Sequence, residues 1–356
     1  MKPTLYLHCG TEKTGSSFLQ TMFVRNRDLL MSRGIHYPKS DKEFEMLEGK
    51  ISPGNGIHLS DTLCDGETNT IKLMSNDLTE ATNFGMNSVL YSSERLFNQF
   101  VEEGSIHKLQ SAAKTAGFGD INALLYFRDP VSHALSMYKH RAKYGDHPDF
   151  DKWLQGKYKI FKLVEAFLEY SKATQIQWTC RKYKPDSAYM VNSAFVNWLE
   201  TEAPDIPEND RINRSLNLNE IRVLQALKKE YPGSENFLRE LLLSIQNEDK
   251  KSEKGLENKY SYLVAEKWRN HEALLDSLNT LMYEDEKLIL QSVEKPCDDE
   301  HFVSLSEKQI QAVAEGMECY WNSQKMTHKI MRILKKAINK IRRKWASSRI
   351  KYNYLK

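Results

Sequence analysis

A lysine, two glycines and several hydroxyl residues are close together in the stretch GTEKTGSSF, which covers residues 10–18. The stretch follows the apolar segment 4–9 and precedes a helical pattern, so we predict a loop between a strand and a helix. The N-terminus of a helix offers unpaired backbone N–H groups and the positive end of the helix dipole, which together favour a phosphate. We therefore expect an anion site formed by Thr11, Glu12, Lys13, Thr14, Gly15, Ser16, Ser17 and Phe18.

The position of Lys13 separates this loop from the ATP-binding pattern GxxxxGK followed by Ser or Thr, in which the lysine comes after the second glycine. Here Lys13 precedes Gly15 by two residues. The backbone geometry is similar, but the cation enters from the other side. A simpler interpretation stays open, in which the glycine and hydroxyl residues form only a tight turn and a helix cap.

A second candidate phosphate site follows the apolar segment 121–127. Arg128 stands at the end of a predicted strand, and Ser136 comes eight residues later, about two turns into the next helix. A guanidinium and a hydroxyl in this arrangement can bind one phosphate from the same side. The alternatives are an ion pair between Arg128 and Asp129 and a packing role for Ser136.

Strands and helices that alternate along the first half of the chain must position these residues. The predicted strands cover residues 4–9, 35–38, 87–94, 121–129 and 174–183. The predicted helices cover residues 17–34, 95–116, 130–145 and 161–173. This alternation favours a parallel sheet that is buried on both faces. Residues 39–70 are rich in Gly, Ser, Asn and Asp and predict a long loop, a place where function often lies.

The second half of the chain has a different pattern. From about residue 218 to residue 294 the pattern is almost wholly helical, which predicts a helical lobe. We therefore divide the chain into an α/β core (1–217), a helical lobe that completes the same domain (218–324) and a basic tail (325–356).

The segments GTEKTGSSFLQ and YFRDPVSHALSMY together resemble the two nucleotide-binding motifs of sulfotransferases that use 3′-phosphoadenosine-5′-phosphosulfate (PAPS). Lysine-threonine-glycine followed by two hydroxyl residues is closest to bacterial and Golgi-type carbohydrate sulfotransferases. The resemblance covers roughly residues 1–220. It implies a P-loop-like three-layer α/β fold, PAPS as co-substrate, 3′,5′-ADP as product and no required metal. It also implies a carbohydrate or another small molecule, bearing a hydroxyl or an amine, as the acceptor.

The same resemblance assigns roles to individual residues. It places Lys13 at the bridging oxygen that leaves sulfur, the backbone from Thr14 to Phe18 at the 5′-phosphate, and Arg128 with Ser136 at the 3′-phosphate. The chain departs from the cytosolic members, because it has no late glycine-rich basic segment. Arg214 and Ser215 in INRSLN (212–217) are weak candidates for nucleotide contacts, and a capped helix start is an alternative interpretation of this segment.

An acceptor hydroxyl needs a base, and two residues are candidates. Glu94 follows Ser92 and Ser93 at a strand end, where open α/β sheets bind ligands. Glu94 could instead only open the next helix, where a carboxylate suits the dipole. His58 is the second candidate because imidazole titrates in a suitable pH range. We assign packing or hydrogen-bonding roles to His8 and His133.

Composition predicts a cytoplasmic protein without a membrane span. Five scattered cysteines fit reduced thiols better than a disulfide framework or a zinc site, and no apolar run approaches the length of a span. The N-terminus shows no signal-peptide pattern. The net charge of +3 is uneven, because residues 325–356 carry 12 Lys or Arg and no acidic residue. The rest of the chain is therefore acidic.

The basic tail predicts an amphipathic helix, whose apolar stripe consists of Met326, Ile330, Leu334, Ala337, Ile341 and Trp345. Such a helix binds an anionic membrane surface or packs on the acidic body, and both interpretations stay open. If the tail binds a membrane surface, the protein is expected to be peripheral on the inner membrane. We expect no nucleic-acid partner.

Two other function classes compete with the sulfotransferase. A P-loop kinase or nucleotide hydrolase would need Mg²⁺ and a strand that ends in Asp, whereas the predicted strand here reaches Arg128 first. A non-catalytic scaffold held at a membrane by the tail would bind no PAPS.

Overall fold

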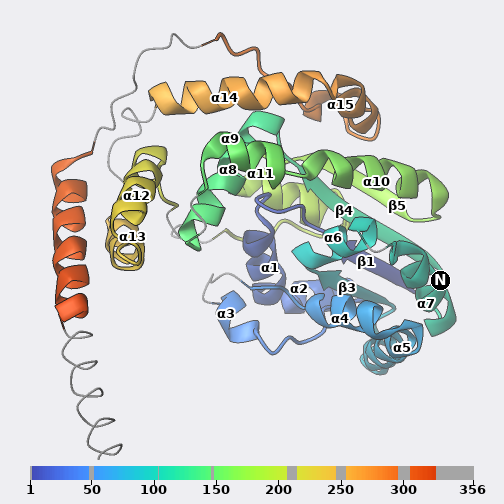
Figure 1. The fold of residues 1–356 in the computed structure, drawn as a ribbon. Helices are drawn as coiled ribbons and strands as arrows, with labels where there is room; N and C mark the ends of the chain where they lie inside the picture. The colour runs from blue at the N-terminus through green and yellow to red at the C-terminus, as the bar shows by residue number, and fades with distance from the viewer. Residues whose placement is uncertain are drawn as a thin grey trace, which may run out of the picture. The chain divides into compact units, whose positions relative to one another are not determined.

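The computed structural model describes residues 2–47, 52–102, 104–145, 148–206, 215–245, 254–295 and 305–325. Its strands form one parallel sheet in the order β2-β3-β1-β4-β5 (Figure 1). The strands are β1 (Thr4–His8), β2 (Ile35–His36), β3 (Ser88–Ser92), β4 (Asp120–Phe127) and β5 (Gln177–Lys182). Each connection between them contains at least one helix, as parallel pairing requires. The predicted α/β class with a central parallel sheet is confirmed.

The register of the sheet decides where the loops meet. His8, the last residue of β1, pairs with Ser92 of β3 on one side and with Leu124 of β4 on the other. β1 and β3 therefore end level, while β4 runs on for three more residues to Phe127. The chain that follows β1 continues along this extension, because the Cys9 N–H donates to the Leu124 carbonyl over 3.0 Å.

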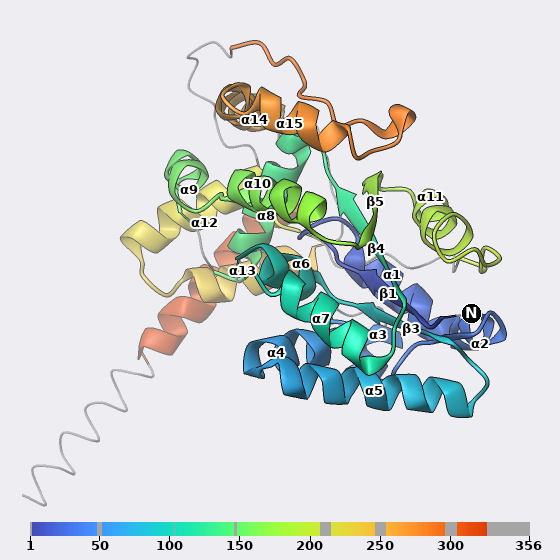
Figure 2. The ribbon, with the colours of Figure 1, turned by 90° about the vertical axis from the view of Figure 1, so that its right-hand side faces the viewer.

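Helices cover both faces of the sheet and make three layers. The helices up to β5 and directly after it are α1 (Ser16–Arg25), α2 (Arg27–Ser32), α3 (Glu43–Leu47), α4 (Ile57–Asp65), α5 (Glu67–Asn83), α6 (Glu94–Glu102), α7 (Ile106–Ala116), α8 (Pro130–Lys143), α9 (Phe150–Gly156), α10 (Ile160–Ala173), α11 (Ser187–Val191) and the π-helical turn η1 (Asn192–Val196). Figure 2 shows α1 and α11 on one side of the sheet and α6 and α10 on the other.

Alternate residues of the strands pack against these two layers, as the period of two in a strand requires. On the side of α1, the core joins Phe23 with Leu90, Leu124 and Phe195. On the other side, the core consists of aromatic pairs that join α6 and α10 to β4 and β5, namely Phe97–Phe127, Phe97–Phe167, Phe127–Phe167 and Phe167–Trp178. This double burial explains why the strands are almost continuously apolar.

The prediction of a long loop at residues 39–70 is wrong. The structure has α3, α4 and the start of α5 in this range. The glycines that indicated a loop serve close packing, because a Cβ on Gly54 would come within 2.0 Å of the Ser92 carbonyl oxygen. Asn55 completes the contact, since its side chain accepts a hydrogen bond from Ser92 N–H at 2.7 Å and donates to the Leu90 carbonyl at 2.9 Å.

Two predicted helices are each divided into two. The predicted helix 17–34 breaks at Asn26, whose side chain donates to the carbonyl of Met22 over 2.8 Å. Such local hydrogen bonds compete with the helix and explain the break. The predicted helix 95–116 forms α6 and α7, and Gly104, with a φ of 64°, lies between them.

The chain divides into two compact units. The first consists of Met1–Tyr138, Phe150–Asn213 and Glu257–Asp298, and the second of Lys139–Asp149, Arg214–Leu256 and Asp299–Lys356. The later helices are α12 (Leu218–Glu230), α13 (Glu235–Ser244), α14 (Lys254–Arg269), α15 (Glu272–Asn279), the 3₁₀ turn η3 (Glu284–Glu286) and a helix at 307–325. Helix predominates among the described residues after residue 217. The helices divide between the two units, so the boundary at residue 217 stays a prediction.

None of the helices in the described ranges has the length and the apolar character that crossing a bilayer demands. The apolar stripe from Met326 to Trp345, and with it the predicted amphipathic helix of the basic tail, lies outside the described residues.

Candidate functional site

The β1–α1 loop is held in place by its own threonines. Thr11 donates its hydroxyl proton to the carbonyl of Tyr126 at 2.7 Å, and Thr14 donates to the carbonyl of Thr11 at 2.5 Å. Both threonines are buried. The Thr11 hydroxyl therefore fixes the loop to β4, and the Thr14 hydroxyl holds the loop to Thr11. Any contact with a ligand would come from the backbone of these residues.

Two positive φ angles turn the loop into α1. Lys13 has a φ of 66° and Gly15 has a φ of 81°, both in the left-handed region. Gly15 also needs to be glycine for space, because a Cβ there would come within 3.0 Å of the Tyr183 ring and 3.2 Å of the Met190 methyl group. Lysine in this region is costly by about 1–2 kcal/mol. Strain of this kind at a non-glycine residue is often found at functional sites.

The first turn of α1 presents unpartnered hydrogen-bond donors. Among the described residues, the backbone N–H groups of Thr14, Gly15, Ser16 and Ser17 have no acceptor. The hydroxyl of Ser16 is fully buried and also has no hydrogen-bond partner in the described part of the chain. Buried polar groups are nearly always paired, so this cluster is an exception that fits an anion site at a helix N-terminus.

Arg128 lies against this loop. One guanidinium nitrogen donates to the carbonyl of Lys13 over 3.3 Å, and Nε donates to the Ser132 hydroxyl over 3.0 Å. The guanidinium also stacks on the Tyr183 ring, 5.2 Å from its centre. The predicted alternative, an ion pair with Asp129, does not form. Asp129 pairs with Lys182 at 2.9 Å and accepts from the backbone N–H of Ile289 at 2.8 Å.

The surroundings of Arg128 leave its charge uncompensated. No carboxylate in the described ranges forms an ion pair with the guanidinium, although the side chain is half-buried. Burial lowers the pKa of Arg128, with Tyr183 and Asp129 opposing the change. Because a partly buried cation without an ion pair is costly, an added anion such as a phosphate would be stabilising here.

Glu94 is positioned by β3, which lies beside β1 on the side opposite to β4. It is the first residue of α6, directly after β3, and its Cγ lies 3.4 Å from the position a Cβ on Gly10 would take. Burial raises the pKa of Glu94 to about 6, and the nearby Glu12 carboxylate acts in the same direction. Lys13 and the Ser16 hydroxyl oppose the rise. A carboxyl with this pKa beside a lysine can accept a proton near neutral pH.

His133 supports the loop from α8, in line with the hydrogen-bonding role predicted for it. Its Nε2 lies 3.1 Å from the carbonyl of Glu12, and its Nδ1 lies 3.0 Å from the hydroxyl of Tyr158. A carbonyl only accepts, so Nε2 carries the proton and Nδ1 accepts from Tyr158. Burial lowers the pKa of His133 to about 4, and the ring is therefore neutral at pH 7.

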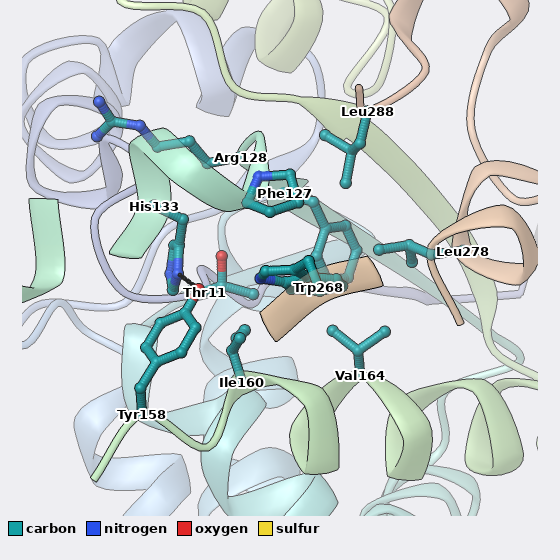
Figure 3. A pocket seen from close by; sticks show the side chains of 11 residues that line it. Thr11, Phe127, Arg128, His133, Tyr158, Ile160, Val164, Trp268, Leu278 and Leu288 are labelled. Carbon is teal, nitrogen blue, oxygen red and sulfur yellow. Dashed lines mark hydrogen bonds between the residues drawn. The ribbon is translucent and has the colours of Figure 1, made fainter. Parts of the chain in front are cut away.

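A small apolar pocket lies behind the loop (Figure 3). Thr11, Arg128, His133 and Tyr158 line one part of it, and apolar side chains around Trp268 line the rest. The pocket has about 20 Å³ of space, enough for one water molecule and far too little for a nucleotide. Arg128 lines the pocket, but Figure 3 shows its guanidinium pointing away from Trp268, and one guanidinium nitrogen donates to the Lys13 carbonyl of the loop.

The remaining predicted residues are spread over several elements. Phe18 is a core residue that is 9% exposed, and Ser17 is half-buried. Ser136 is half-buried on α8, one turn beyond the Ser132 that contacts Arg128. His58 on α4 is half-exposed, and its Nε2 is 3.7 Å from a carboxylate oxygen of Asp41.

Of the segment 212–217, the structure describes residues 215–217, which belong to the second unit. Arg214 lies outside the described residues, and Ser215 is exposed in the second unit. Asn217 caps α12, because its side chain accepts from Glu220 N–H at 2.8 Å while the Glu220 carboxylate accepts from Asn217 N–H at 2.8 Å. The alternative of a capped helix start is therefore confirmed for this segment.

Sequence reasoning missed two residues of the site, Ser132 and Tyr183. Ser132 could have been found from its position in the first turn of α8, which begins two residues after Arg128. Tyr183 directly follows β5, at the carboxyl end of a parallel strand, where such sheets bind ligands. Its position in the sequence could therefore have pointed to it. Its contact with Gly15 depends on the strand order and is not visible in the sequence.

Taken together, the structure brings Lys13, Glu94 and Arg128 to one edge of the sheet from three different connections. No protein family, curated protein or solved structure was found to match the chain. The geometry of this edge is therefore the basis for assigning a function.

Proposed function

We propose that the chain is a PAPS-dependent sulfotransferase that transfers a sulfuryl group to a hydroxyl of an acceptor, with a carbohydrate as the expected class. The observation that carries the proposal is the contact of Arg128 with the β1–α1 loop. An arginine without a counter-ion lies beside four unpartnered N–H donors at the start of α1. PAPS has separate 5′ and 3′ phosphate groups, and these two features suit one phosphate each.

The residues at this edge fit PAPS. The backbone from Thr14 to Ser17 is suited to the 5′-phosphate, since its donors are unpaired. Arg128 is suited to the 3′-phosphate, supported by Ser132 and Tyr183. The same proposal includes the finer description of the fold as P-loop-like, with the loop in the place of a phosphate-binding loop after the central strand.

PAPS supplies the sulfuryl group, and the residues of the chain position the reactants and move the proton. Glu94 takes the proton of the acceptor hydroxyl as the acceptor oxygen forms its bond to sulfur. The bond between sulfur and the bridging oxygen breaks, and that oxygen stays on the 5′-phosphate of 3′,5′-ADP. Lys13 stabilises the charge on this leaving oxygen, an effect worth roughly 100- to 1000-fold in kcat for a well-placed donor.

The location of the protein is part of the proposal. We place it in the cytoplasm, with the basic tail 325–356 as its contact with an anionic membrane surface. Flotation with liposomes that contain phosphatidylglycerol, compared between the full chain and a chain ending at residue 324, tests this. Equal flotation of the two chains would rule out the tail as an anchor.

Calorimetric titration tests the activity class. We expect 3′,5′-ADP to bind without Mg²⁺, 5′-AMP to bind more weakly and ATP to show no advantage with Mg²⁺. Arg128→Ala should weaken 3′,5′-ADP at least tenfold more than it weakens 5′-AMP, because the variant removes a contact to the 3′-phosphate, which 5′-AMP lacks. Arg33→Ala is the matched control, since its exposed ion pair with Glu202 is remote from this contact in the sequence and contributes little to stability.

Binding of MgATP in preference to 3′,5′-ADP would overturn the proposal in favour of a kinase or hydrolase. Binding of neither nucleotide would overturn it in favour of a scaffold. With 3′,5′-ADP binding established, transfer of sulfur-35 from labelled PAPS to a panel of glycans identifies the acceptor.

A further inference from the structure

The side chains of Ser16 and Ser17 differ in their surroundings although both begin α1. Ser16 is fully buried, whereas Ser17 is half-buried. A Cβ on Gly10 would come within 1.9 Å of the Ser16 hydroxyl oxygen and 3.4 Å of Glu94 Cγ. The hydroxyl of Ser16 and the side chain of Glu94 therefore converge on the same backbone position, one from α1 and the other from α6.

The Ser16 hydroxyl has a use at this position that its backbone does not share. It forms no hydrogen bond of regular geometry among the described residues, yet its interaction with the Glu94 side chain is of the hydrogen-bonding kind and opposes the rise in the pKa of that carboxyl. Leaving a buried hydroxyl unpaired costs about 1–3 kcal/mol. A small movement of either side chain would pair them, since both already lie over Gly10.

We infer that Ser16 is a positioning residue for Glu94, with its hydroxyl donating to one carboxylate oxygen and leaving the other oxygen for the acceptor. This inference rests on the proposed function. It divides Ser16 between two tasks, because the backbone N–H serves the phosphate and the side chain serves the base. It also gives Gly10 a reason, since any larger residue there would displace the Ser16 hydroxyl.

The charges that face Glu94 explain why a neutral donor suits this place. From the loop, Glu12 disfavours the ionised carboxylate and Lys13 favours it. A phosphate bound at the start of α1 would add negative charge and disfavour the ionised form further. A hydroxyl holds the carboxylate in its ionised form without neutralising it, so the base keeps its ability to take a proton.

The pKa of Glu94 tests the inference directly. We would follow the carboxyl carbon of Glu94 by ¹³C NMR through a pH titration of the full chain, with its signal assigned by its loss in Glu94→Gln. The pKa of Glu94 should rise by about one unit in Ser16→Ala and stay near the wild-type value in Ser16→Thr, which keeps the hydroxyl. An unchanged pKa in Ser16→Ala, or an equal rise in both variants, would overturn the inference.

Two further measurements keep the result interpretable. Gly10→Ala displaces Ser16 without removing it, so it should raise the pKa of Glu94 as Ser16→Ala does, and it replaces that variant if Ser16→Ala fails to fold. In kinetics, Ser16→Ala should shift the acidic limb of the kcat profile to higher pH, whereas Ser17→Ala should leave that limb in place. Failure of the wild type to bind 3′,5′-ADP refutes the proposed function, while the NMR titration still reports whether Ser16 controls Glu94.

Discussion

The guanidinium of Arg128 donates a hydrogen bond to the carbonyl oxygen of Lys13, which lies 115 positions earlier in the chain. The contact follows from the sheet, because β1 and β4 are neighbours and β4 extends beyond the end of β1. The same bond helps to hold Lys13 in its left-handed conformation. The lysine and the arginine are thus parts of one site, and a change in either is expected to be felt at the other.

Lys13→Ala should abolish most of the activity and leave the fold intact. The side chain is half-buried and the φ of 66° is equally unfavourable for alanine, so the free energy of unfolding should change by less than about 1 kcal/mol. In contrast, kcat should fall roughly 100- to 1000-fold. Urea unfolding and sulfur-35 transfer measure the two effects. A loss of stability matching the loss of activity would contradict the assigned role.

Glu94→Gln should stabilise the protein at neutral pH while removing activity. The pKa of Glu94 is raised by burial from its ordinary 4.5 to about 6, so its contribution to stability is present below pH 4.5 and is lost as pH rises through 6. Glutamine avoids this loss. Relative to the wild type, the variant should therefore gain about 2 kcal/mol between pH 4 and pH 8. A constant difference across this range, measured by urea unfolding, would show that Glu94 has an ordinary pKa.

Gly54→Ala should destabilise the protein far more than Gly85→Ala, although both glycines have similar positive φ angles of 76° and 74°. At Gly85 nothing lies within 4 Å of an added Cβ, so only the backbone cost of about 1–2 kcal/mol applies. At Gly54 the added Cβ would collide with the Ser92 carbonyl oxygen, which adds about 1–3 kcal/mol. Thermal unfolding of the pair measures the difference, and equal melting temperatures would refute the packing role of Gly54.

Glu286→Ala should cost about 3–5 kcal/mol of stability, because it leaves the buried Arg181 guanidinium unpaired. The two groups form a bidentate pair at 2.6 and 2.7 Å. Burial alone would favour the protonated carboxyl, but the hydrogen bonds from Arg181 outweigh it and lower the pKa of Glu286. The contribution of the pair is therefore present above the ordinary carboxyl pKa and is lost as pH falls.

An apolar double variant controls for this effect. Arg181→Met combined with Glu286→Leu should recover most of the loss, since it removes both charges at once. Removal of the exposed Arg33–Glu202 pair should cost less than about 1 kcal/mol. If the double variant were as unstable as Glu286→Ala, packing and not charge would explain the loss.

The strands could be predicted well because their signal is local. A parallel sheet covered on both faces needs short apolar segments, and those segments stand out between turn residues. The range 39–70 failed for a non-local reason. Gly54 indicates a turn when considered alone, whereas in the fold it allows the chain to approach the end of β3.

The candidate site, too, could be predicted only where its signal is local. The sequence order of Lys13 and Gly15 predicted the loop, and the spacing after β4 pointed to Arg128. The partners of Arg128 could not be predicted as easily, because Tyr183 depends on the placement of β5 beside β4. The direction of the Ser16 side chain toward Glu94 likewise requires β1 and β3 to end level.

The pairing of Arg181 with Glu286 has a consequence for folding during synthesis of the chain. Glu286 is synthesised 105 residues after Arg181, which at roughly 5–20 residues per second is a delay of about 5–20 s on the ribosome. During that interval β5 carries an arginine whose carboxylate does not yet exist. The first unit therefore reaches its final stability only when its last segment, residues 257–298, has emerged. We expect the sheet to assemble first and to be stabilised afterwards by the pairing of Glu286 with Arg181.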